Sequence, residues 1–451
     1  MSSLLLDLMA RHRRGEAVGI YSVCSANEHV LRAAMEVAQQ YGGPLLIEST
    51  SNQVDQFGGY TGMTPPQFRE YVQALARSQG FAVDRLILGG DHLGPNAWQH
   101  LPALEAMGHA RELIRAYVAA GFEKIHLDCS MSCADDPQRL PDETVAERSA
   151  DLARVAEQAA QAAGLTPPCY VIGTEVPIPG GEASLEAGLA VTTPEAAAQT
   201  LKVHALAFAS PDLQAAWGRV IAMVVQPGVD FDHSSIHHYR PAEATALSQF
   251  VTEQTGLVFE AHSTDYQSEA SLHALVRDHF AILKVGPAVT FALREAWFAL
   301  AAIEAAMLPA ERCSRLPEVL DAAMLASPKQ WQKHYSGDAA TQALLRAYAF
   351  SDRCRYYWGE PQVQAALDNL IANLDALTLP LPLLSQFMPE QYAAVVQGQL
   401  SRSAAALAQH RVGQVLAQYA RACGGRLSLE PEAAASGERS QSAPTLESSN
   451  A

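Results

Sequence analysis

The sequence predicts an α/β fold, a closed (β/α)₈ TIM barrel followed by a C-terminal helical extension. Short apolar runs alternate with amphipathic stretches through residues 17–306. The runs are nearly continuous in Val, Ile and Leu, which is typical of parallel strands buried on both faces. Eight such pairs are present, and the first turn lacks the glycine pattern common in open doubly wound sheets. These observations favour a closed barrel over an open sheet.

The predicted strands and helices alternate in the order that this fold requires. The strands are Val18–Val23, Pro44–Glu48, Arg85–Leu88, Lys124–Asp128, Tyr170–Glu175, Arg219–Gln226, Val258–His262 and Ala281–Val285. The helices that follow them are Glu28–Gln40, Pro66–Gln79, Ala110–Ala120, Asp142–Ala163, Pro194–Phe208, Pro241–Gln254, Ser268–Val276 and Thr290–Ala305. Glycine ends the first and third helices, and proline opens the second, fifth and sixth, as expected at helix boundaries.

The domain organisation is predicted from changes in composition along the chain. We expect the barrel to span residues 1–306 and a helical extension packed on it to span 307–426, which is rich in Ala, Leu and Gln. Residues 427–451 contain few apolar residues and are predicted to be a disordered tail. Within the extension, residues 351–358 (SDRCRYYW) are basic and aromatic. They indicate either helix packing or a cap over the barrel mouth that offers arginine to a phosphate.

Composition excludes several classes of function. The formal net charge of −17 argues against a nucleic-acid partner, because phosphate neutralisation needs clustered Lys and Arg. No apolar run reaches the length of about 18 residues that a membrane span needs. The arginines near residues 11–14 follow an apolar run, which is the wrong order for a signal peptide. The seven cysteines are scattered, so we expect reduced thiols and a cytoplasmic protein.

Polar residues stand at the predicted carboxyl ends of most strands, where the active site of this fold lies. They are Glu48, Asp91, His92, Asp128, Glu175, Gln226, His262 and Lys284. Any one of them is explained equally well as a structural cap or a satisfied core residue. Burying the whole set in a purely structural core would be costly, so together they predict a polar functional site.

The residue types indicate metal-assisted chemistry on a sugar. Imidazole is a good ligand for a divalent metal ion, which makes His92 and His262 candidate ligands. Asp91 is a candidate for moving a substrate proton, and Glu175 for either base or ligand. Asp128 is expected to orient a neighbouring histidine or to accept a hydroxyl group.

The remaining strand-end residues are expected to contact the substrate. An amide such as that of Gln226 can both donate to and accept from a sugar hydroxyl. Lys284 is expected to bind a phosphate or hydroxyl group rather than to form a Schiff base, because surrounding carboxylates keep a lysine charged. Residues 232–238 hold several histidines, which indicate either a metal site or a solvated loop. There is no phosphate-binding loop motif and no nucleophile-elbow motif, so a P-loop kinase is not expected.

Several long motifs identify a family resemblance. They are GGDHLGPN (89–96), GFEKIHLDCSMSC (121–133), YVIGTEVPIPGGEAS (170–184), VVQPGVDFDHSSIHHY (224–239), VFEAHSTDYQ (258–267), RDHFAILKVGPAVTFALREA (277–296) and SDRCRYYW (351–358). On these motifs, residues 1–425 resemble the Z-subunit family of tagatose-1,6-bisphosphate aldolase, the companion of a class II aldolase subunit.

The resemblance implies roles for named positions. Class II aldolases are metal-dependent barrels that act on ketose bisphosphates. Asp91-His92 looks like their pair of catalytic aspartate and metal-binding histidine, and His262 looks like a later ligand. The resemblance also implies that Ser263, Thr264 and Asp265 contact the substrate, and Lys284-Val285-Gly286 looks like a lysine-containing strand motif of these aldolases. Glu48, at the end of the second predicted strand, is a further candidate for substrate binding. One position departs from the pattern, because Gln226 stands where the catalytic subunits carry another ligand histidine. Glutamine is the weaker ligand, which puts independent catalysis in doubt.

Two functions follow from this resemblance. The first is a Z-type subunit that supports the stability and activity of a class II aldolase partner in galactitol or tagatose catabolism. The alternative is a metal-dependent 4-epimerase or aldolase of ketoses such as tagatose and fructose, which would act by retro-aldol chemistry. Either function implies a divalent metal ion, for which zinc is the expectation, and a ketose or ketose-phosphate ligand. The sequence leaves open whether the chain forms a homo-oligomer.

Overall fold

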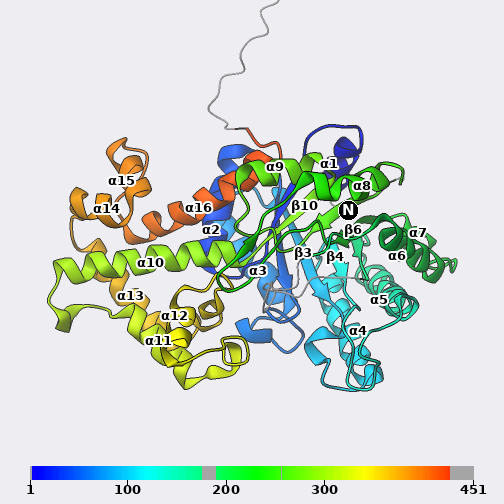
Figure 1. Cartoon of the computed structure of the whole chain (residues 1–451), viewed down its shortest axis with the longest axis horizontal. Helices are drawn as coiled ribbons and strands as arrows, with labels where there is room; N and C mark the ends of the chain where they lie inside the picture. Colours follow the sequence, from blue (N-terminus) through cyan, green and yellow to red (C-terminus); the bar gives the residue numbers. More distant parts are fainter. Residues whose placement is uncertain (1–2, 175–188, 255, 427–451) are drawn as a thin grey trace, which may run out of the picture.

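The computed structural model describes residues 3–174, 189–254 and 256–426, and it confirms the predicted barrel (Figure 1). Eight parallel strands close on themselves in the order β1-β10-β9-β6-β5-β4-β3-β2. Their bounds are β1 Ile20–Val23, β2 Leu45–Thr50, β3 Leu86–Leu93, β4 Lys124–Leu127, β5 Cys169–Ile172, β6 Val220–Val225, β9 Val258–Ala261 and β10 Phe280–Val285. Nearly every strand residue is buried, as expected for strands covered on both faces.

Helices surround the barrel, and the predicted ones are all present with small shifts at their ends, except that the third begins at Ala103 rather than Ala110. They are α2 Glu28–Tyr41, α3 Pro65–Ser78, α4 Ala103–Ala119, α5 Asp142–Ala163, α6 Pro194–Ala207, α8 Pro241–Thr252, α9 Glu269–Arg277 and α10 Pro287–Met307. Side-chain caps fix several of the starts. Asn27, for example, accepts the main-chain N–H groups of His29 and Val30 at the first turn of α2.

The third strand is longer than its sequence indicates. The glycines after Leu88 resemble a strand terminator, yet β3 continues to Leu93 and keeps its register with β2. The reason lies inside the barrel, where a Cβ atom at Gly89 would collide with the carboxylate of Glu48. Glycine at this position therefore makes room for a buried charged side chain rather than ending the strand.

The sequence did not predict two helices and a β-hairpin that the structure contains. A short helix, α7 (Gln214–Trp217), precedes β6, and a hairpin of β7 (Asp230–Phe231) and β8 (Ile236–His237) follows it. The third is α1 (Ser3–Arg13), whose buried Leu5 and Met9 join an apolar cluster with residues inside the barrel. Its barrel members include Ile20, Leu46, Ile87 and Val258, which lie at or near the amino-terminal ends of their strands. Helix α1 therefore closes the end of the barrel opposite the predicted site.

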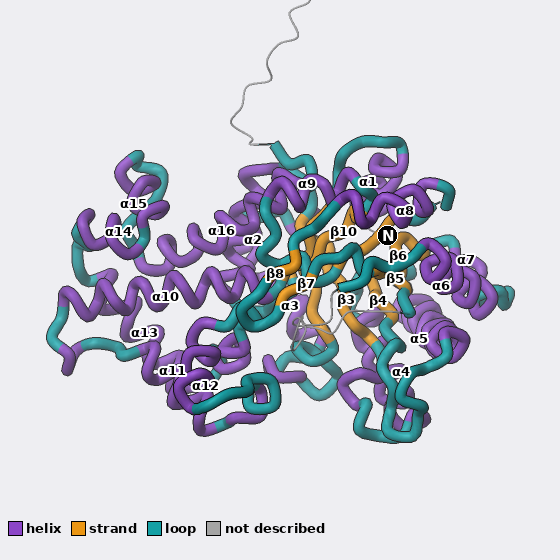
Figure 2. Tube along the Cα trace, in the orientation of Figure 1, coloured by secondary structure: helices purple, strands orange, loops and turns teal. Residues whose placement is uncertain are grey.

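The extension consists of helices that leave the barrel and return to it. Its helices are α11 Leu316–Ala326, α12 Ala339–Tyr348, α13 Pro361–Asp375, α14 Leu381–Phe387, α15 Pro389–Val396 and α16 Ala404–Ala422. Figures 1 and 2 show α10 projecting from the barrel, α11–α15 beside its far part, and α16 running back along it. Helix α16 packs on α2, α9 and α10, and Arg421 forms an ion pair with Glu269 of α9 at 2.7 Å. None of the described helices has the length and apolarity needed to cross a membrane. The predicted tail lies outside the described residues.

The cap formed by α1 can be tested by truncating one apolar side chain. Leu5→Ala removes buried methyl groups beneath the barrel and is expected to lower the free energy of unfolding by about 2–5 kcal/mol. Leu4 is 38% exposed on the same helix, so Leu4→Ala serves as the matched control and should change stability by about 0.5 kcal/mol or less. Urea-induced unfolding measures both. Equal effects of the two substitutions would show that α1 does not seal the barrel.

Candidate active site

Three histidines meet at the carboxyl end of the barrel. His92 is on β3, His126 is on β4 and His262 directly follows β9. All three are buried, and their ring centroids lie 4.9–5.1 Å from one another. His92 adopts a left-handed backbone conformation with φ of 50°, which non-glycine residues rarely adopt outside functional or tight-turn positions. The barrel thus brings together side chains from three different strands.

A carboxylate lies within hydrogen-bonding distance of one ring nitrogen of each histidine. The contacts are His92 Nδ1 to Asp128 Oδ2 at 2.7 Å, His126 Nδ1 to Asp91 Oδ1 at 3.1 Å, and His262 Nε2 to Glu260 Oε1 at 3.0 Å. The second nitrogen of His92, Nε2, lies 3.7 Å from Asp91 Oδ2, so Asp91 contacts the rings of both His92 and His126. Carboxylates commonly orient metal-binding histidines in this way, with one nitrogen facing the carboxylate and the other facing the metal.

The donor set fits a divalent metal ion. Ligand atoms of Asp91, His92, His126 and His262 all lie within 4.8 Å of one another. Among the described residues, the buried Nε2 atom of His126 has no hydrogen-bond partner, which is costly for a polar atom unless something else binds it. Imidazole nitrogens together with one carboxylate are a typical ligand set for zinc and related ions.

The surrounding charges set the protonation of this cluster. Although burial alone would raise it, the pKa of Asp91 is held well below its usual range by His92, Lys284 and the contact with His126. Burial lowers the pKa of His262 to about 4, so its ring is neutral at pH 7 and has a lone pair for a metal. Burial also opposes a charge on His92, but Asp91 and Asp128 outweigh it and raise the pKa of His92.

A buried ion network fills the barrel beneath the histidines. Lys124 of β4 reaches across to Glu48 at 2.6 Å and to Glu260 at 2.7 Å. Lys284 of β10 forms ion pairs with Glu48 and with Asp91, the latter at 2.8 Å. Glu48 also accepts a hydrogen bond from Ser22 at 2.7 Å. Asp91 and Glu260, which contact the histidines, are therefore themselves held in place from below.

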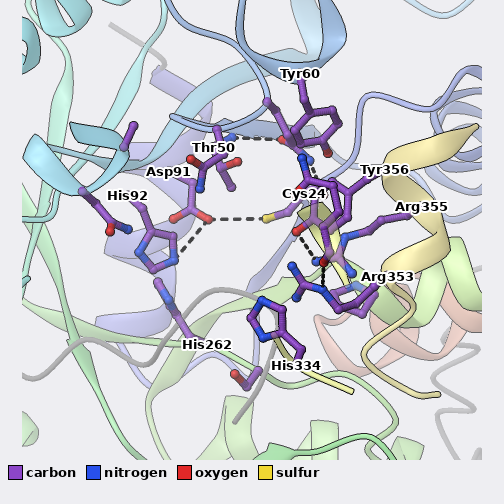
Figure 3. A pocket seen from close by; sticks show the side chains of 18 of the residues that line it. Cys24, Thr50, Tyr60, Asp91, His92, His262, His334, Arg353, Arg355 and Tyr356 are labelled. Atoms are coloured by element: carbon purple, nitrogen blue, oxygen red, sulfur yellow. Dashed lines mark hydrogen bonds and ion pairs between the residues drawn. The ribbon is translucent and has the colours of Figure 1, made fainter. Parts of the chain in front are cut away.

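A cavity of about 730 Å³ opens above the histidines. Asp91, His92, His262 and Lys284 line its inner part, as Figure 3 shows for the first three. Loop residues after β2 and β3 and residues of the extension complete the wall. Its size suits a six-carbon sugar with attached phosphate groups.

Residues 5–424 match the family described as D-tagatose-1,6-bisphosphate aldolase subunit GatZ/KbaZ-like. The chain belongs to this family. A crystal structure of a probable tagatose 6-phosphate kinase from Sinorhizobium meliloti is 48% identical with a TM-score of 0.83, and the match covers 90% of this chain and all of that one.

Two aldolase structures are more distant. The YdjI aldolase of Escherichia coli is 11% identical with a TM-score of 0.38, covering 82% of this chain and 98% of that one. A fructose-bisphosphate aldolase of Campylobacter jejuni is 13% identical with a TM-score of 0.42, covering 82% and 91%.

Some predicted site residues of this GatZ/KbaZ-like chain do not face the cavity in the described part. The amide oxygen of Gln226 accepts the main-chain N–H groups of Gly228 and Val229 at 2.8 and 3.0 Å, which closes a turn. Thr264 is fully buried and donates its hydroxyl to the main-chain oxygen of Lys284 at 2.6 Å. Glu48 contacts Lys284 and Asp128 contacts His92, so both carboxylates lie behind residues that line the cavity.

The remaining predicted residues divide between the cavity wall and the part of the chain that is not described. Ser263 and Asp265 both line the cavity. Asp265 also accepts the main-chain N–H groups of Gly286 and Ala288 at the start of α10, and burial raises its pKa to about 6. Glu175 lies outside the described residues.

Both interpretations of residues 351–358 find support. Cys354, Tyr357 and Trp358 are buried in the packing of the extension, whereas Arg353 and Arg355 line the cavity. The histidine-rich segment 232–238 forms the β7–β8 hairpin. There, His233 bonds through both ring nitrogens to the extension, to Ser351 at 2.8 Å and to the main-chain oxygen of His334 at 2.9 Å. Its contacts therefore support a role in docking the hairpin.

Sequence reasoning missed three residues of the site of this GatZ/KbaZ-like protein. His126 and Lys124 lie two and four residues before Asp128, and Glu260 lies two before His262. Side chains two apart on a strand point to the same face. Reading back along the strand from Asp128 and from His262 in steps of two residues would have found all three. Charged residues in an apolar strand were the available signal.

The metal site is tested by removing a ligand and, separately, the carboxylate behind a ligand. We expect His126→Ala to weaken Zn²⁺ binding the most, because it removes a nitrogen that has no other partner. Asp128→Asn should weaken it by about 10–100-fold through the loss of orientation of His92. Calorimetric titration of chelator-treated protein measures both. His273→Ala, on an exposed face of α9, is the control and should bind as the wild type does. Unchanged affinity in His126→Ala would remove this residue from the ligand set.

Proposed function

We propose that the chain carries out metal-dependent retro-aldol chemistry on a ketose or ketose phosphate, as an aldolase or a ketose 4-epimerase. One observation supports the proposal most strongly. Three buried histidines, each contacting a carboxylate, meet at the floor of a large cavity, and the Nε2 atom of His126 has no hydrogen-bond partner among the described residues. A site that merely stabilised a fold would gain nothing from leaving this nitrogen without a partner. Membership of an aldolase-related family supports the same chemistry.

The residues that would hold the ion are His92, His126 and His262, with Asp91 beside them. Zinc is our proposal for its identity, because imidazole ligands suit it. A divalent ion there would supply a Lewis acid that polarises the ketose carbonyl and stabilises negative charge next to it. Asp128 and Glu260 are positioning residues in this scheme, since they orient rings of the set.

Asp91 is the proposed acceptor of the substrate proton. It lines the cavity, and Lys284 keeps it ionised from one side. A carboxylate in this place can take the proton of the C4 hydroxyl as the C3–C4 bond breaks, and the C4 carbon becomes a carbonyl. The bonding electrons pass to C3 as an enediolate; if the proton taken by Asp91 is then delivered to C3 and the two fragments leave, the reaction is that of an aldolase. Return of the bond to the opposite face of that carbonyl, with the proton given back by Asp91, gives a 4-epimer.

Several further roles belong to this proposal. Lys284 faces the cavity and can donate to a hydroxyl or phosphate oxygen of the sugar. Ser263 and Asp265 line the same wall and are proposed substrate contacts. Burial raises the pKa of Cys24, so this thiol beside Asp91 stays neutral and is not proposed as a nucleophile. Glu175 keeps the proposed role of a second base or ligand.

A second candidate function is support of a class II aldolase partner. The description of the family as an aldolase subunit favours it. The position of Gln226, whose amide is used within its own turn, also fits a site that lacks one ligand of the catalytic subunits. The two functions are compatible, since a subunit can bind sugar and partner together.

The experiment is an NMR time course of tagatose 1,6-bisphosphate, and of free tagatose, with the purified chain and a divalent metal ion. We expect triose phosphates or a 4-epimer, and loss of both when chelator is added. Asp91→Asn should lower kcat by about 10²–10⁴-fold. Asp84→Asn, exposed next to the other end of β3, is the control and should retain activity. Unchanged sugars in the wild type, together with higher activity of an added class II aldolase subunit, would favour the second candidate instead.

A further inference from the structure

We propose that the wall of the cavity formed by the helical extension is a binding site for a phosphate dianion. The side chains that form it all come from residues after the barrel and carry basic or ring nitrogen groups. They are Lys329, Lys333, His334, Arg353 and Arg355. The inference rests on the proposed function only for the identity of the sugar that carries the phosphate.

The two arginines are fixed in place but not neutralised. Arg355 donates to the main-chain oxygens of Ser351 and Asp352, the latter at 3.0 Å, and to the hydroxyl of Tyr356 at 2.8 Å. Arg353 is only 8% exposed and donates its Nε–H to the main-chain oxygen of Gln330. Within the described residues, neither guanidinium forms an ion pair with a carboxylate. Main-chain carbonyls orient these groups without cancelling their charge, which leaves N–H donors for an anion.

Nearby acids do not compensate this charge. Asp352 acts on Arg355 through space, but its carboxylate oxygens accept from Thr290 at 2.6 Å and from the Cys354 thiol at 3.3 Å. Asp352 does not line the cavity; among the described residues, the carboxylates that do are those of Asp91 and Asp265. Asp91 is bound to Lys284, and Asp265 is bound to main-chain N–H groups of α10. Within the part of the chain that the structure describes, the two arginines of the basic wall therefore have no carboxylate hydrogen-bonded to them.

The positive charge of this wall helps to lower the pKa values of two neighbouring groups, His334 and Tyr356. Burial, together with Arg353 and Lys333, lowers the pKa of His334 to about 4, and its buried Nε2 atom has no hydrogen-bond partner. Burial opposes ionisation of Tyr356, yet Arg355 and Arg353 outweigh it and lower the pKa of the phenol. A neutral imidazole and an arginine-bound phenol at the edge of the cavity fit a site that binds an anion.

The number and type of cations favour phosphate over a carboxylate. Two guanidinium groups present planar, multiple N–H donors, and two exposed lysines add mobile charge. A phosphate monoester offers three acceptor oxygens and nearly two negative charges at pH 7, which this set can engage together. A carboxylate offers two oxygens and one charge, and would leave part of the set unpaired.

The basic wall and the histidine cluster belong to the same cavity. Figure 3 shows Arg353, Arg355 and Tyr356 on one side of the pocket, facing Asp91 and His92 on the other. A ketose whose carbonyl lies at the histidine end would extend the far end of its carbon chain toward the arginines. The extension would then select sugars that carry a phosphate at that far end, and a single chain would supply both ends of the site.

The test is calorimetric titration of the full chain, treated with chelator, with inorganic phosphate as the probe. Arg355→Gln should weaken phosphate binding by about 10-fold or more, because it removes a charge-assisted donor pair. Lys329→Met/Lys333→Met should weaken it by about 3–10-fold, since exposed charges contribute less. Arg402→Gln is the matched control: this exposed arginine also donates to a main-chain oxygen but does not line the cavity, and its loss should leave affinity unchanged.

The outcomes separate this inference from the proposed function, because phosphate binding needs neither metal nor turnover. Equal phosphate affinity in the wild type and both cavity variants would overturn the site, and so would acetate binding as tightly as phosphate. If Arg355→Gln fails to fold, judged by circular dichroism, the exposed lysine pair decides alone. Phosphate binding without any sugar turnover would support the site while contradicting the proposed chemistry. Sugar turnover with no phosphate binding would do the reverse.

Discussion

The buried ion network inside the barrel is the constraint on which the rest of the site depends. Lys124 joins Glu48 of β2 to Glu260 of β9, and Lys284 joins Glu48 to Asp91 of β3. Removing one partner of a buried ion pair typically costs about 3–5 kcal/mol, because the other charge is left unpaired. Such a network is expensive to build for stability alone. Here the network fixes the positions of Asp91 and Glu260, each of which contacts a histidine nitrogen.

The helical extension gives the barrel a second wall above this centre. Helix α10 carries the chain away from the barrel and α16 returns it, where Tyr419 donates to the main-chain oxygen of Thr264 at 2.6 Å beside the site. The hairpin after β6 is tied to the same extension through His233. Residues far apart in the sequence thus form one cavity, with histidines at its floor and arginines at its rim. The arrangement suits a substrate with one polar end at each wall.

Much of the fold could be predicted from the sequence, because each strand is a compact apolar run followed by an amphipathic helix. The site was predicted in part. Asp91, His92 and His262 stand at strand ends, where the fold itself indicates function. Lys124, His126 and Glu260 were missed because they lie inside apolar strands, and their use depends on which strands face one another across the barrel. Pairing across a closed barrel is a tertiary property that a single strand does not encode.

Tertiary contacts also decide where strands end, how turn residues are used and which residues of the extension reach the cavity. Gly89 looks like a strand terminator until the Glu48 side chain that needs its space is known. Gln226 is predicted to contact a sugar, and only the folded structure shows that its amide oxygen also closes a turn. The arginines of residues 351–358 suggested an anion site, but only the folded extension shows that they line the cavity and lack carboxylate partners among the described residues. Local pattern finds such candidates, and packing decides how they are used.

We propose that the histidine cluster, rather than the carboxylates below it, holds a divalent ion. A competing group of Glu48, Asp91 and Glu260 also has ligand atoms close enough to bind one, but Lys124 and Lys284 already neutralise it. X-ray absorption spectroscopy of the zinc-loaded protein distinguishes the two. The account predicts about three imidazole nitrogens at about 2.0–2.1 Å. A first shell of oxygen alone, or no bound zinc, would contradict it.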